Sequence, residues 1–312
     1  MSERTSAERM KVIFEQVKNW KRWGAEDEMG ALNLITPARR TLAASLISSG
    51  EVVSCAQEFP VTPSVENPTP ALHLMARAGD ACCIPGTGGL EASMDFVGVA
   101  FHGMAVSHID ALCHVFVDGR MYNDRAASEV KSTGAEANSI MVAGDGIVGR
   151  GVLLDIPRLR GVPYLEADAS VLPAELDAAE EAAGLRVESG DILLVATGRD
   201  ARRDAMGRWN PMQGGLAGLH PECIPWLRQR DVAVLGSDGV SDPLPSNAAP
   251  GWPMPVHQCA LVAMGVHLLD NLQLGRLAQA CASQARWEFM FMLSPLRIEG
   301  ATGSPVNPIA VF

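Results

Sequence analysis

The chain has no long apolar run and no cluster of basic residues. None of its 312 residues lies in a stretch of 18 or more apolar positions, which a membrane-spanning helix needs, and the charged N-terminus lacks the apolar core of a signal peptide. The formal net charge is -11, without a Lys/Arg cluster that would mark a nucleic-acid footprint. We therefore expect a cytoplasmic protein with no membrane contact and no nucleic-acid partner.

Familiar arrangements of nucleophilic residues are also missing. The seven cysteines are an odd number without paired C-x-x-C spacing, and the adjacent Cys82 and Cys83 rarely make a useful bridge, so we expect free thiols. Cys113 precedes His114, but neighbouring side chains point away from each other, which argues against a Cys–His nucleophile pair. The same reasoning applies to Ser107 and His108, and the chain has no G-x-S-x-G motif.

Histidine is scarce, yet three of the seven fall within thirteen positions: His102, His108 and His114. Residues two apart on a strand share a face, about 6.6 Å apart, and residues four apart share a face of a helix. A strand that ends in a helical turn at Asp110 would therefore bring His108, Asp110 and His114 together. Histidine and aspartate are good ligands for zinc or manganese. The alternative is that these are packed core histidines and that Asp110 caps a helix.

The remaining pattern predicts a mixed α/β domain. With 47% hydrophobic residues and 20% charged residues the chain can bury a full core, and no linker divides it. We expect a helical N-terminal extension at 1–44 packed on one domain at 45–312. The expected helices are 6–22, 37–49, 174–184 and 220–229, the expected strands are 51–58, 96–110, 148–156, 191–197, 232–236 and 286–293, and 60–95 is expected to form a long loop or lid.

The order of these motifs resembles the cyclase-like metal-dependent hydrolase family, which includes bacterial kynurenine formamidase and isatin hydrolase. Its signature, H-x-x-x-H-x-D-x-x-x-H, surrounds the metal, and His108, Asp110 and His114 match its second His, its Asp and its last His. His257 looks like a later ligand, and Asp270 stands where the family usually has Glu. Residues 190–198, 232–243 and the C-terminal 22 residues also agree, and 23–37 resembles the extra N-terminal segment of longer members.

The resemblance implies an α/β fold with a barrel-like sheet and surrounding helices, and a homodimer or homotetramer. It implies hydrolysis of a small amide, lactam or aryl formamide, with one or two zinc or manganese ions and no organic cofactor. The implied ligands are His108, Asp110, His257 and Asp270. His114 would be the catalytic histidine that takes a proton from water and returns it to the leaving group; a fourth metal ligand is its alternative role.

Two departures from the family pattern affect the metal site. Met104 stands where the first metal histidine is expected, and a thioether is a poor ligand for such an ion. His102 lies two residues earlier with the same strand parity, and it could substitute if the strand bulges. Asp270 has one methylene less than Glu, about 1.5 Å of reach. A single-ion site is therefore favoured, with a metal-free binding protein and a metal-dependent lyase or cyclase as alternatives.

Other candidates rest on weaker grounds. Trp23 and Asn33 are substrate-pocket candidates by resemblance alone, and Met104 and His220 are added as residues that could line the pocket. Asp238 and Asp242, in a polar turn after the predicted strand 232–236, are interpreted as turn residues rather than as partners of the ligands.

Overall fold

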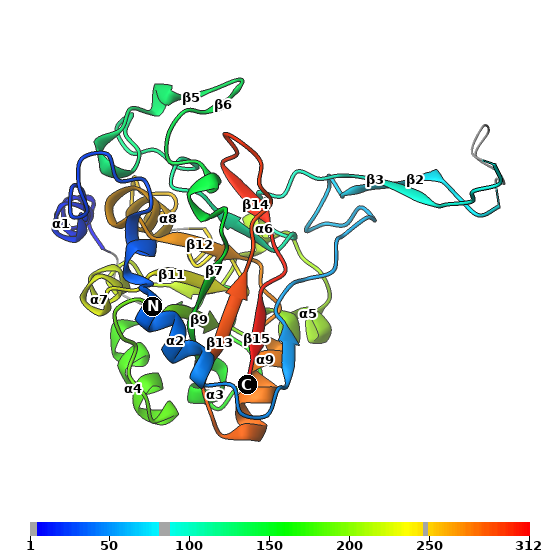
Figure 1. Ribbon diagram of the computed structural model, residues 1–312. Helices are drawn as coiled ribbons and strands as arrows, with labels where there is room; N and C mark the ends of the chain where they lie inside the picture. Colours follow the sequence, from blue (N-terminus) through cyan, green and yellow to red (C-terminus); the bar gives the residue numbers. More distant parts are fainter. Residues whose placement is uncertain (1–4, 81–87, 246–248) are drawn as a thin grey trace.

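A nine-stranded mixed sheet forms the centre of the fold in the computed structural model, which describes residues 5–80, 88–245 and 249–312 (Figure 1). The sheet curls into a half-barrel, which confirms the predicted fold class. The four strands β7, β9, β11 and β12 are parallel, and the other pairings are antiparallel. In sheet order the strands are β1 (Val52–Ser54), β15 (Ile309–Val311), β13 (Glu288–Leu293), β7 (Ile147–Asp155), β9 (Ile192–Ala196), β11 (Val234–Ser237), β12 (His267–Asp270), β4 (His108–Asp110) and β14 (Gly303–Pro305).

Helices cover the sheet, and buried side chains pack against both of its faces. Along β9, Leu193 and Val195 belong to one apolar cluster while Ile192 and Leu194 belong to the other, because successive strand residues point to opposite faces. The helices are α1 (Ala7–Val17), α2 (Pro37–Ser45), α3 (Ile156–Arg160), α4 (Pro173–Ala183), α5 (Arg199–Met206), α6 (Pro211–Gly214), α7 (Cys223–Arg230), α8 (Pro255–His257), its π-helical continuation η5 (Gln258–Met264), and α9 (Gly275–Gln284).

Short elements complete the described fold. The 3-10 turns are η1 (Gly30–Leu34), η2 (Tyr122–Asp124), η3 (Ala127–Glu129) and η4 (Ile140–Ala143). Three two-stranded pairs lie outside the large sheet: β2 (Leu72–Arg77) with β3 (Met94–Gly98), β5 (Val130–Lys131) with β6 (Gly134–Ala135), and β8 (Ser170–Val171) with β10 (Gly218–Leu219). Among the described residues, no helix has both the length and the apolar character needed to cross a membrane.

Two predicted elements are wrong in ways that matter for the site. The expected strand 96–110 is divided into β3 and β4, because Gly103 adopts φ +148° and the intervening residues bend. The expected loop 60–95 contains β2 and the start of β3, which form a hairpin that extends away from the body (Figure 1). The adjacent Cys82 and Cys83 lie outside the described residues, and the five described cysteines are free thiols.

The N-terminal segment binds to the end of η5. The predicted helix 6–22 stops at Val17, because Asn19 N then donates to Ala263 O at 2.9 Å and Trp20 Nε1 donates to Val262 O at 2.7 Å. Further along, Ala31 N donates to Gly265 O at 2.7 Å. These tertiary bonds outweigh the helical pattern of residues 18–22.

Gly30 makes the close approach to η5 sterically feasible. It has φ +57°, and a Cβ atom at this position would lie 2.2 Å from Gly265 O. We expect Gly30→Ala to reduce the free energy of unfolding by about 2–3 kcal/mol, from left-handed strain and the backbone clash. Urea unfolding measures this change. Gly275→Ala is the control, since a Cβ there meets nothing within 4 Å; equal stabilities of the two variants would contradict the prediction.

Candidate metal centre

Two antiparallel strands and two connecting segments deliver the side chains of this site. In the β4–β12 pair, Asp270 stands opposite His108, and Asp110 shares a strand face with His108. His257 ends α8, and His102 comes from the bent segment between β3 and β4. The hydrogen-bonded strands β4 and β12 thus supply two carboxylates and one histidine.

Asp110 is the hub of the group. Its Oδ1 lies 3.0 Å from His102 Nδ1 and 3.3 Å from His108 Nε2, and its Oδ2 lies 3.5 Å from His257 Nε2. His257 Nε2 also lies 3.3 Å from Asp270 Oδ2. The structure therefore brings together all four residues predicted as ligands, together with His102.

Several of these atoms are buried without any hydrogen bond. They are both carboxylate oxygens of Asp110, Asp270 Oδ1 and His102 Nδ1. These atoms lie close to one another, but their angles do not allow hydrogen bonds. A buried, ionised carboxylate without hydrogen bonds costs several kcal/mol of stability. Cations bound in this group would give these atoms partners, since His102 and Asp110 belong to one set of possible ligands and Asp110 and Asp270 to another.

The donor atoms form two overlapping triads. His102, His108 and Asp110 make one, and Asp110, His257 and Asp270 make the other, with the donor atoms of each triad within 4.8 Å of one another. Imidazole nitrogens with carboxylate oxygens suit zinc or manganese. These residues fit a divalent ion, and Asp110 is shared by both triads.

Opposite charges within the group shift the pKa values of Asp110 and His257 toward their ionised forms. Burial by itself would raise the pKa of Asp110, but the nearby His102, His108 and His257 outweigh it and hold that pKa well below its usual value. Burial would lower the pKa of His257, yet Asp270, Asp110 and Asp242 raise it well above normal. Asp110 is therefore ionised and able to act as a ligand at neutral pH.

A bend in the backbone, and not the alternation of side chains along a strand, places His102 at the site. The backbone bends at Gly103, so residues 102–104 have no strand parity. His102 turns toward Asp110, while Met104 packs against the apolar cluster of Leu216, Val240 and Leu244. In this geometry the side chain of His102, and not that of Met104, faces Asp110.

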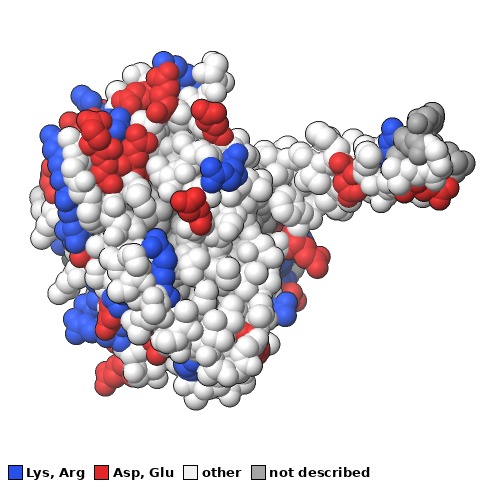
Figure 2. All heavy atoms as spheres, in the orientation of Figure 1, with Lys and Arg blue, Asp and Glu red and all other residues white. Residues whose placement is uncertain are grey.

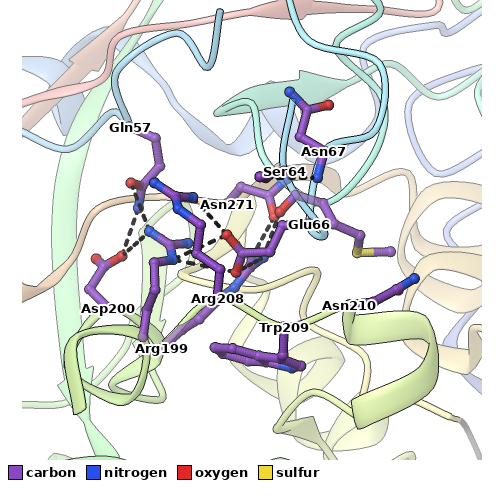
Figure 3. Close-up of polar contacts among 12 residues, drawn as sticks. Gln57, Ser64, Glu66, Asn67, Arg199, Asp200, Arg208, Trp209, Asn210 and Asn271 are labelled. Carbon is purple, nitrogen blue, oxygen red and sulfur yellow. Dashed lines mark hydrogen bonds and ion pairs between the residues drawn. The ribbon is translucent and has the colours of Figure 1, made fainter. Parts of the chain in front are cut away.

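A buried arginine holds this bend in place. Arg199, shown with Asn271 in Figure 3, donates from Nη1 to Asn271 Oδ1 at 2.7 Å. Its Nη2 donates to Met104 O. Asn271 Nδ2 donates to Gly103 O and Val106 O. Because Asn271 directly follows Asp270, this network joins the His102 segment to the end of β12. A lone arginine or asparagine in the sequence gave no signal for this role.

His114 lies beside His102. The chain turns after Asp110, with His114 N donating to Ala111 O at 3.0 Å, and the two imidazole rings stack with centroids 3.8 Å apart and planes 2° apart. Burial lowers the pKa of His114 to about 4, so its ring is a neutral imidazole at neutral pH. The neighbouring Cys113 is not poised as a nucleophile, since burial raises its thiol pKa to about 12.

The interpretation of Asp242 as a turn residue was incomplete. Asp242 Oδ2 lies 2.6 Å from His257 Nδ1, and the carboxylate also accepts from the backbone N–H groups of Val256 and His257. This contact directs His257 Nε2 toward Asp110 and Asp270. Asp238, in contrast, accepts from Thr197 N, Gly198 N and Arg199 N at the start of α5, so it caps a helix that lies far from it in the sequence.

The predicted pocket residues have polar contacts of their own. Asn33 Nδ2 donates to Asp27 Oδ1 and Gly30 O, and the Arg22 guanidinium lies 4.7 Å from the Trp23 ring centroid. His220 Nδ1 accepts from Glu222 N at 3.3 Å. These contacts are local, and substrate roles for Trp23, Asn33, His220 and Met104 stay predictions.

Comparison with known proteins now identifies the family. The family model described as "Putative cyclase" matches residues 48–242, more than half of the chain. The chain belongs to this cyclase family. No curated protein matches the sequence.

Solved structures show the same cyclase fold. A crystal structure described as a novel cyclase is 29% identical, with a TM-score of 0.84 over 95% of this chain and 99% of that one. Isatin hydrolase A from Ralstonia solanacearum is 23% identical, with a TM-score of 0.61 over 87% and 94%. An isatin hydrolase bound to the product analogue thioisatinate is 19% identical, with a TM-score of 0.59 over 88% and 97%. At these lower identities the isatin hydrolases share the fold.

The Asp242–His257 contact predicts a test of the centre. We expect Asp242→Asn to weaken zinc binding about ten-fold to a hundred-fold, because a neutral amide is a poorer acceptor for His257 Nδ1 and orients the ring less well. Competition with a zinc-binding dye measures the affinity. Asp168→Asn, at an exposed loop position, serves as the control; equal affinity in both variants would show that Asp242 does not support a ligand.

Proposed function

We propose that the protein is a metal-dependent hydrolase of a small amide, lactam or aryl formamide. The observation that carries the proposal is the buried carboxylate of Asp110, whose two oxygens have no hydrogen bond and face three histidines. A site built in this way is costly unless a cation completes it. Membership of the cyclase family agrees with this chemistry.

The substrate class rests on fold likeness and general chemistry. Isatin hydrolases share this fold, and one is bound to an analogue of its product. Isatin is a cyclic amide, so a lactam or a related aryl amide is the substrate class we infer.

Zinc or manganese would be held by His102, His108, Asp110, His257 and Asp270, as one ion in either triad or two ions that share Asp110. Such an ion, when bound, lowers the pKa of water toward neutrality and polarises a carbonyl group. Asp242 keeps His257 oriented, and Arg199 keeps the His102 segment in place through Met104 O.

His114 is the proton carrier in this proposal. Its neutral ring lies against His102 at the edge of the ligand group. From that position the imidazole can take a proton from water and pass it to the leaving nitrogen, which is the usual division of labour for a histidine base and acid. Cys113 and Ser107 have no part in the step.

Metal content tests the centre directly. We expect roughly one or two zinc or manganese ions per purified chain, lost in Asp110→Asn because the shared carboxylate is removed. Elemental mass spectrometry gives the number, and Asp168→Asn is the control for losing one carboxylate. Absence of metal even after incubation with zinc or manganese would favour a binding protein without metal chemistry.

Activity tests the role of His114. With lactam and aryl formamide substrates, we expect His114→Gln to lower kcat about a hundred-fold to ten-thousand-fold while metal content is retained, because only the proton carrier is removed. Full activity in that variant would contradict the role. Turnover in ¹⁸O-labelled water should place the label in the product carboxylate; product without label would indicate a lyase or a cyclase.

A further inference from the structure

Most residues of segment 54–66 line a groove of about 690 Å³ that lies outside the metal centre. This segment leads from β1 toward the β2–β3 hairpin, which extends from the body in Figures 1 and 2. The rest of the lining consists of Ala105, Arg203, Arg208, Gln273 and Arg276. No residue of the metal centre belongs to this lining, and the volume is typical of a site for a small molecule.

The charge balance of this groove is opposite to that of the whole protein. The chain has 36 Asp and Glu residues against 25 Lys and Arg residues. The groove, in contrast, is lined by three arginines, Arg203, Arg208 and Arg276, and by two glutamates, Glu58 and Glu66. Because the net charge of the chain repels anions, an excess of guanidinium groups in one groove marks a place where an anion can bind.

The two carboxylates nearest these arginines do not cancel their charge. The Glu66 side chain is 1% exposed, and its carboxylate lies 2.8 Å from Arg208 Nη1 and 3.3 Å from Arg203 Nε. Arg199 Nη2 lies 3.8 Å from the same carboxylate, and Figure 3 shows Glu66 near Arg199 and Arg208. Asp200 pairs with Arg203 at 3.1 Å. Three guanidinium groups therefore share two carboxylates, and this network keeps a positive charge.

Arg208 and Arg276 keep N–H donors for a ligand. The Arg208 side chain is 55% exposed, and of its N–H groups only those of Nη1 bond to Glu66. Arg276 is exposed, and no hydrogen bond or ion pair holds its guanidinium within residues 5–80, 88–245 and 249–312. It stands in the first turn of α9, where the helix dipole disfavours a cation and no acidic residue compensates. A bound anion would relieve this repulsion.

Apolar side chains in the same groove indicate what kind of anion fits it. Phe59 and Val61 line the groove and are 45% and 52% exposed, and Pro60 and Pro63 lie next to them in the lining. An inorganic anion would leave these surfaces in water. A carboxylate with an apolar body would cover them and also accept charge-assisted hydrogen bonds from guanidinium groups. The groove therefore favours an organic acid over phosphate or sulfate.

We propose that this groove is a second ligand site, which binds a small carboxylate with an apolar body. The carboxylate accepts hydrogen bonds from Arg276 and Arg208, and the apolar body lies against Phe59 and Val61. The site is separate from the metal centre, and it does not depend on the proposed hydrolase activity.

Binding of benzoate to the full chain tests the proposal. Ligand-observed NMR titration should give a dissociation constant of about 1 mM. Benzamide has the same ring without the charge, and it should bind at least about ten-fold more weakly. Arg276→Gln should weaken benzoate binding about ten-fold, because it removes a charged donor that has no other partner. The matched control is Arg40→Gln, which removes one exposed positive charge outside the groove and should keep the wild-type affinity.

A further variant separates this groove from the metal centre, because a carboxylate can also bind a metal ion. Asp110→Asn removes the shared carboxylate of the metal centre and should leave benzoate binding unchanged. Benzoate binding that is lost in Asp110→Asn but kept in Arg276→Gln would place the ligand at the metal centre and overturn the proposal. Absence of binding to the wild type, or equal binding of benzoate and benzamide, would overturn it without any variant.

Discussion

The ionised carboxylate of Asp110, buried without a hydrogen bond, is the constraint around which this structure is organised. Removing such a group from water costs several kcal/mol, and three histidine nitrogens lie 3.0–3.5 Å from its oxygens without a hydrogen bond to them. A folded protein retains such an arrangement when a cation or a reaction requires it. The antiparallel pairing of β4 with β12 creates it, since the register sets Asp270 opposite His108 beside Asp110.

The two histidines of the site that lie outside the sheet are held by buried hydrogen bonds from distant parts of the chain. His257 is oriented by Asp242, and the π-helical segment that follows it is fixed at its end by Asn19, Trp20 and Ala31 of the N-terminal segment. His102 is held indirectly, through Arg199 and the carbonyl of Met104. The same Arg199 also lies 3.8 Å from the buried carboxylate of Glu66, in the segment that precedes the β2–β3 hairpin.

The sequence predicted the elements that depend on a short, continuous stretch of residues. The buried run Ile192–Ala196 indicates a strand because it is continuous and apolar, and the spacing of His108, Asp110 and His114 indicates a strand ending in a turn because both elements have a fixed period. The mixed α/β fold follows from such runs. The contribution of His102 could not be predicted from strand parity, because the conformation of Gly103 decides it.

Features that depend on contacts between residues far apart in the sequence could not be predicted from the periodicity of apolar residues. Asp242 resembled a turn residue because its partner, His257, lies 15 residues further along the chain. The helix 6–22 was expected to continue past Val17, and only bonds to η5 show why it stops. The β2–β3 hairpin was interpreted as part of a loop because its large apolar side chains are exposed and do not pack into a core.

Anomalous diffraction from crystals soaked in zinc locates an ion without assuming any substrate. We expect a peak within about 2.0–2.2 Å of an Asp110 oxygen, with His257 and Asp270 or His102 and His108 completing the coordination. A peak elsewhere, or none in crystals with Asp110 ordered as described, would contradict the claim that this carboxylate is buried to hold a cation.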